Sequence, residues 1–63
     1  MPYVNVRVTS GITTEQCRQI VGEITDTLVR VLDKKPEETH VVIDEIRPDR
    51  WGFEGRLTSE SGP

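Results

Sequence analysis

The chain has 63 residues, enough for one small domain, and its 8 basic and 11 acidic residues give a net charge of −3. The basic residues are scattered and form no stripe that could follow a phosphate backbone, so we expect no nucleic-acid partner. No apolar run approaches the roughly 20 residues that cross a bilayer, and no signal peptide precedes the first strand pattern. We therefore expect no membrane association and a cytoplasmic location.

A chain this short needs a source of stability beyond its own core. A domain of about 60 residues buries only about 60% of the surface that its unfolded chain exposes. Cys17 is the single cysteine, which excludes an internal disulfide and fits a reducing compartment. The single histidine, His40, has no metal-ligand spacing around it, so we expect neither a metal nor a cofactor. The remaining way to stabilise the domain is oligomerisation, and we expect a homo-oligomer.

Residues 3–9 alternate strictly between polar and apolar, which predicts a half-buried strand that Ser10-Gly11 ends. A capping box of Thr13 and Gln16 follows and predicts the start of a helix. Apolar residues then recur at helical spacing from Cys17 to Leu32, and we expect the helix to end near Asp33.

Residues 40–46 predict a second strand with a nearly continuous apolar centre, typical of a strand covered on both faces or of one in a sheet shared between subunits. Two strands that flank a helix predict a β-α-β unit with parallel strands. Residues 51–57 hold two aromatics among glycines, which indicates a short hairpin or bulged ribbon that packs on another subunit. The predicted fold class is α/β (α+β), with one domain at 1–57 and a polar, disordered tail at 58–63.

Pro2 is the first candidate functional residue, because it follows the initiator Met1 at the start of the first strand. Methionine aminopeptidase removes an initiator methionine readily when a small residue follows. The exposed secondary amine would then be an N-terminal amine, which ordinarily titrates at about 7.7–8.0. A modest downward shift of its pKa makes it a general base at neutral pH. The alternative is that proline is simply tolerated as the first residue of a strand.

Three further residues are candidates, each with a purely structural alternative. Parallel neighbours start at the same edge of a sheet, so His40 should lie near Pro2, in its own subunit or a neighbour, where it could hydrogen-bond a substrate oxygen. Otherwise it is only a polar residue at a strand edge. Trp51 and Phe53 could wall an apolar pocket that lowers the pKa of a nearby amine by desolvation, or form interface core.

The chain resembles the small subunits of the 4-oxalocrotonate tautomerase family from Met1 to about Leu57, without insertions. The resemblance rests on the chain length and on the order of features: Pro2, the alternating strand, Gly11 before Thr13-Thr14-Glu15-Gln16, Val41-Val42-Ile43-Asp44-Glu45, and Trp51-Gly52-Phe53-Glu54-Gly55. It implies a β-α-β subunit with a C-terminal hairpin, paired into dimers and usually assembled as a hexamer. It also implies that Pro2 is a general base that moves a proton between the carbons of an enol or dienol keto acid. Trp51 takes the aromatic position that lines the pocket, with Phe53 beside it.

The chain departs from the family pattern at two substrate-binding positions, where arginines are expected and Ile12 and His40 stand. Arginine is a permanently charged, bidentate fork, whereas isoleucine offers nothing polar and histidine one or two donors. We therefore expect a small or apolar enol with one carboxylate. A replacement cation could come from one of three arginines near the hairpin: Arg47, Arg50 and Arg56. With fewer cations, desolvation by Ile12, Trp51 and Phe53 must hold the pKa of the Pro2 amine below that of a free N-terminal proline.

Three functions follow, of which the first is preferred and the other two are alternatives. The first is a tautomerase of a 2-hydroxy-2-alkenoate, dienoate or aryl-enolpyruvate-type acid. The second is a non-catalytic oligomeric scaffold of the same fold, which the missing arginines favour. The third is a hydratase-like or dehalogenase-like relative that uses protonated Pro2, although the chain has no convincing carboxylate to activate water.

Overall fold

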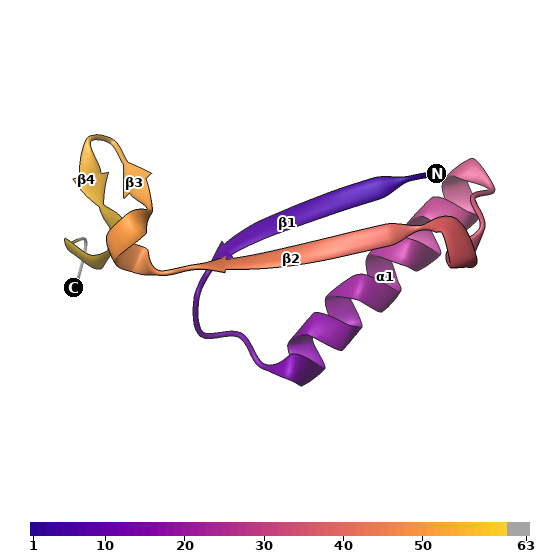
Figure 1. Cartoon of the computed structure of the whole chain (residues 1–63), viewed down its shortest axis with the longest axis horizontal. Coiled ribbons are helices and arrows are strands. Elements are labelled where there is room, and N and C mark those ends of the chain that lie inside the picture. The colour runs from indigo at the N-terminus through magenta and orange to yellow at the C-terminus, as the bar shows by residue number, and fades with distance from the viewer. Residues whose placement is uncertain (61–63) are drawn as a thin grey trace.

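The structure is a computed structural model that describes residues 1–60. Its main elements are β1 (Tyr3–Thr9), α1 (Thr14–Leu32), β2 (His40–Ile46), β3 (Gly52–Phe53) and β4 (Arg56–Leu57), joined by 3₁₀ turns at Pro36–Glu38 and Pro48–Arg50. Figure 1 shows β1 and β2 side by side with α1 along them, while the β3–β4 hairpin stands apart beyond the carboxyl ends of the strands. The predicted β-α-β fold with a C-terminal hairpin is confirmed.

β1 and β2 pair in parallel, with Tyr3 opposite His40 and Thr9 opposite Ile46. Side chains alternate along each strand, so one face of the sheet carries the half-buried apolar residues and packs on α1. We call the other face the open face, and its members are Tyr3, Asn5, Arg7, Thr9, His40, Val42, Asp44 and Ile46. The apolar centre of β2 is therefore covered by α1 on one side only, and Val42 remains 41% exposed on the open face.

The ends of α1 are those that the sequence predicts. The Thr13 side chain accepts from the Gln16 amide while the Gln16 side chain accepts from the Thr13 amide, which completes the capping box. Asp33 ends the helix in the left-handed conformation, and its amide donates to the Val29 carbonyl. Both ends are thus satisfied locally, so α1 can begin and end where it does without help from the rest of the fold.

The hairpin turns on Glu54 and Gly55, which both have positive φ, as a two-residue turn matched to strand twist requires. Directly after β4, Thr58–Glu60 form another 3₁₀ turn, in which the Thr58 amide and hydroxyl both donate to the Trp51 carbonyl. The sequence prediction placed these three residues in a disordered tail, and here the structure differs, because the threonine closes the hairpin. Residues 61–63 of the predicted tail lie outside the described residues.

No residue among 1–60 is fully buried. The chain exposes 5074 Å², whereas about 4100 Å² is expected for a compact monomer of this mass. Its radius of gyration is 14.8 Å against about 11 Å for a compact domain of this length. Phe53 is 64% exposed and Val31 is 68% exposed. The apolar side chains of a single chain are therefore only partly covered, and burying them requires contact with another surface.

Candidate active site

Pro2 and His40 lie together at the amino edge of the sheet. The His40 amide donates to the Pro2 carbonyl at 3.0 Å, which extends the β1–β2 ladder by one hydrogen bond. Pro2 is half-buried, whereas Met1 before it is 87% exposed. The Pro2 nitrogen is a peptide amide while Met1 is attached and gains basicity only after Met1 is removed. The backbone at Pro2 is thus fixed, and the residue that blocks its nitrogen is accessible.

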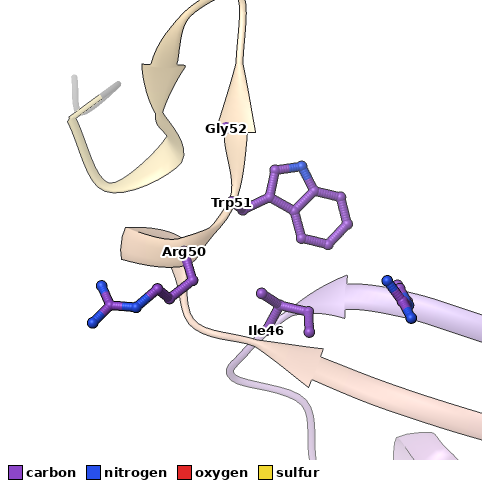
Figure 2. A pocket seen from close by; sticks show the side chains of 5 residues that line it. Ile46, Arg50, Trp51 and Gly52 are labelled. Carbon is purple, nitrogen blue, oxygen red and sulfur yellow. The ribbon is translucent and has the colours of Figure 1, made fainter.

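The carboxyl edge of the sheet holds an open hollow of about 400 Å³, lined by Arg7, Ile46, Arg50, Trp51 and Gly52. Arg7 and Ile46 come from the ends of β1 and β2, and the other three residues come from the chain that leads into β3. Figure 2 shows the Trp51 ring above Ile46, whereas the Arg50 side chain extends away from the ring. The hollow therefore has an apolar wall of indole and isoleucine beside a strand that carries a cation.

The loop after β1 is tied to the same edge. The Ser10 amide donates to the Ile46 carbonyl at 2.9 Å, and the Ile12 amide donates to Glu45 Oε1 at 3.0 Å. Gly11 between them has φ +115°, which an L side chain rarely adopts. Ile12 is half-buried there but does not line the hollow. This turn fixes the position that an arginine occupies in the family pattern.

A single chain keeps the predicted site residues in two groups. Pro2 and His40 lie at the amino edge, while Ile12, Trp51 and Phe53 follow the carboxyl ends of the strands. The seven-residue strands separate these edges by about 20 Å, at roughly 3.3 Å per residue. The expected desolvation of the Pro2 amine by Trp51 and Phe53 therefore does not occur within one chain. It requires a second copy, and the roles of all five residues stay predictions.

The sequence interpretation missed a polar network on the open face. Asn5 Nδ2 donates to Asp44 Oδ2 at 2.9 Å and to the Val42 carbonyl at 3.3 Å, while Arg7 Nε donates to Asn5 Oδ1 at 3.1 Å. Arg7 Nε is also 3.5 Å from Asp44 Oδ2. Alternation in β1 places Asn5 and Arg7 on one face, and the parallel register places Asp44 opposite Arg7. Both signals were present in the sequence, but only the register connects them.

Within residues 1–60, no three His, Cys, Asp or Glu side chains gather closely enough to hold a metal ion. In the same part of the chain, no helix combines the length and apolarity that crossing a membrane requires.

Comparison with known proteins gives consistent results. The family model described as "Tautomerase enzyme" matches residues 2–60. A protein of Dickeya dadantii named "Probable tautomerase K2" is 44% identical over 61 residues, which cover 95% of this chain and 91% of that protein. A solved 4-oxalocrotonate tautomerase homologue, TTHB242, superposes with a TM-score of 0.89 at 30% identity and covers all of both chains. DmpI from Helicobacter pylori gives a TM-score of 0.88 at 28% identity, over 95% of this chain and 94% of that one.

The chain belongs to the tautomerase family, among the relatives of 4-oxalocrotonate tautomerase. The resemblance inferred from Pro2, the capping box and the aromatic hairpin is confirmed. Family membership supports an isomerase of the tautomerase type that acts on a small molecule.

Proposed function

We propose that this protein catalyses the keto–enol tautomerisation of a 2-hydroxy-2-alkenoate, dienoate or aryl-enolpyruvate-type acid, with the Pro2 amine as general base after removal of Met1. The observation that carries the proposal is the position of Pro2. Pro2 directly precedes β1, and its carbonyl accepts a hydrogen bond from the His40 amide. The chain that carries it belongs to the tautomerase family. A base must be fixed relative to its substrate to be effective, and a strand end provides that.

The proposed reaction moves one proton and consumes no co-reactant. The Pro2 amine takes the proton of the enol hydroxyl, and the oxygen electron pair forms the carbonyl as the carbon–carbon double bond shifts. The protonated amine then returns the proton to carbon. His40 begins β2 next to Pro2 in the backbone ladder, and its side chain is proposed to donate a hydrogen bond to a substrate oxygen.

The proposed site is completed in an oligomer. Within the described part of the chain, β1 and β2 pair only with each other, so the outer side of each strand is open to pairing with a strand of a second chain. Two such strands related by a two-fold axis run antiparallel. Such pairing brings the amino edge of one chain, with Pro2, toward the carboxyl edge of another, with Trp51. The lack of any buried residue in 1–60 and the excess exposed surface support association. We propose a dimer-based homo-oligomer, with a hexamer as its expected size, and a cytoplasmic location because Cys17 is free.

The test compares two preparations of the full chain. In one, intact mass spectrometry confirms that Met1 is absent; in the other, a short N-terminal extension keeps the Pro2 nitrogen an amide. Tautomerisation of several enol acids is then followed by ultraviolet absorbance. We expect activity only in the first preparation. Equal rates in both preparations would contradict the role of Pro2. No activity in either would favour the hypothesis of a non-catalytic oligomeric scaffold.

Oligomerisation is tested by native mass spectrometry and by thermal unfolding at several protein concentrations. If the core is completed between subunits, the melting temperature should rise with concentration by mass action. A monomer with a concentration-independent transition would contradict the shared site.

A further inference from the structure

The hollow at the carboxyl edge places one cation beside an apolar wall. Trp51 and Ile46 form the wall, and Arg7 and Arg50 are the charged residues among its lining. Arg50 extends away from the indole (Figure 2). Its Nη1 donates to the Asp49 carbonyl at 3.0 Å and lies 3.5 Å from Asp49 Oδ2. Arg50 is therefore bound to its neighbour Asp49 through Nη1 and extends away from the apolar wall.

Arg7 is held along one edge of its guanidinium only. Its Nε donates to Asn5 Oδ1, and Asn5 in turn holds the Asp44 carboxylate through its amide nitrogen. Asp44 thus faces the Nε edge, where the ion-pair distance is 3.5 Å. Within residues 1–60, neither Nη1 nor Nη2 of Arg7 donates a hydrogen bond. The free Nη edge is the part of an arginine that grips a carboxylate with two parallel hydrogen bonds.

The other candidate cations near the hairpin do not offer this arrangement. Arg47 donates through Nε and Nη2 to the two oxygens of Asp49, which saturates the bidentate fork. Arg56 lies opposite Phe53 in the hairpin and does not line the hollow. Among the residues that the structure describes, Arg7 thus lines the hollow with two Nη atoms that donate no hydrogen bond, whereas the Arg50 side chain extends away from the indole.

We propose that Arg7, Trp51 and Ile46 form a carboxylate subsite in which the Arg7 Nη edge binds the acid group and the indole packs on an apolar substituent. The inference rests on the proposed tautomerase function and narrows its substrates. A single guanidinium beside an apolar wall fits a monocarboxylate with an aryl or alkenyl tail. The nearby Asp44 carboxylate would repel a second carboxylate. Arg7 would then determine specificity for the acid group. Strand alternation places it on the open face, away from the two positions, Ile12 and His40, at which the family pattern has arginines.

Trp51 is the only tryptophan, so its fluorescence reports binding in this hollow. The experiment titrates the full-length protein, in its native assembly and at low ionic strength, with phenylacetate and with phenylacetamide. These probes share the aryl tail and differ in charge. We expect the acid to bind about tenfold more tightly than the amide, as a charge-assisted pair at an open site should. Arg7→Met should remove that preference and leave amide binding unchanged.

Two matched variants locate the effect. Arg56→Met removes the same charge outside the hollow and should keep the preference for the acid. Arg50→Met removes a charge at the rim whose side chain extends away from the indole, and it too should keep the preference. Loss of the preference in Arg50→Met, or an equal loss in all three variants, would overturn the assignment to Arg7.

Arg7→Lys provides a second variant if Arg7→Met fails to assemble. Lysine keeps the charge but lacks the planar fork, so the preference for the acid should fall severalfold; an unchanged preference would overturn the subsite. Repeating the titration in Pro2→Ala separates the two hypotheses. Activity should fall about 100-fold or more there while the preference for the acid persists. Absence of a preference for the acid in the wild type contradicts the subsite even if Pro2 is essential, whereas a Pro2→Ala protein as active as the wild type contradicts only the proposed base.

Discussion

The two edges of the β1–β2 sheet differ in how much of a site one chain provides. At the amino edge, Pro2 is half-buried and fixed through one backbone hydrogen bond to His40. At the carboxyl edge, side chains from both strands and the hairpin enclose an open hollow with an apolar wall. In the proposed mechanism, one edge would position the base and the other would shape the binding surface, so a tautomerisation would need both edges. The following predictions test this division.

The largest effect is expected at the amino edge. Pro2→Ala should lower kcat/KM about 100-fold or more, because a positioned general base contributes roughly 10²–10⁴ in rate. The base must be deprotonated to act, so activity should rise with pH as the Pro2 amine loses its proton. In the variant this limb should weaken and move, because a primary α-amine replaces the secondary amine of proline. The measurement is a pH–rate profile for both proteins. An unchanged profile would remove Pro2 from the mechanism.

At the carboxyl edge, Trp51→Ala should raise KM about tenfold with a smaller change in kcat, because the apolar wall of the hollow is lost but the base is retained. Steady-state kinetics with an aryl enol acid provide the measurement. Phe53→Ala is the comparison variant, because Phe53 does not line the hollow of one chain and its loss should raise KM less than Trp51→Ala does. An equal rise in KM for both variants would mean that the hairpin acts through assembly, which native mass spectrometry would show.

His40→Gln tests whether the amino edge also binds substrate. Glutamine keeps a hydrogen-bond donor without a titratable charge, so we expect a loss of about threefold to tenfold in kcat/KM, the size of one neutral hydrogen bond. The backbone bond from residue 40 to Pro2 is retained. A kcat/KM equal to that of wild type would make His40 a strand residue without a substrate contact.

The smallest effect is expected in the loop behind the hollow. Glu45→Ala removes the acceptor of the Ile12 amide and should cost about 0.5–1 kcal/mol of unfolding free energy, because the bond is exposed. Urea unfolding provides the measurement. Glu37→Ala, in the Pro36–Glu38 turn, is the control and should change the unfolding free energy less. The reverse order would mean that Glu45 does not hold the loop.

Local patterns predicted the elements well because the signals are local. Alternation from Tyr3 to Thr9 defined β1, and the Thr13–Gln16 capping box set the start of α1. Each of these depends on residues within a few positions of one another. The ordered turn at Thr58–Glu60 was missed because Thr58 is held by the carbonyl of Trp51, seven residues earlier. The polar composition of residues 58–60 does not indicate such a hydrogen bond.

By itself, the sequence determined the order of the elements, the family and the place of Pro2 at a strand start, because periodicity, caps and chain order are one-dimensional properties. Only the tertiary structure decided that Pro2 and Trp51 lie at opposite edges of the sheet within one chain. Only the register of the parallel strands decided that Arg7, Asn5 and Asp44 form one network. The reason is that strand length and pairing register determine which distant residues meet.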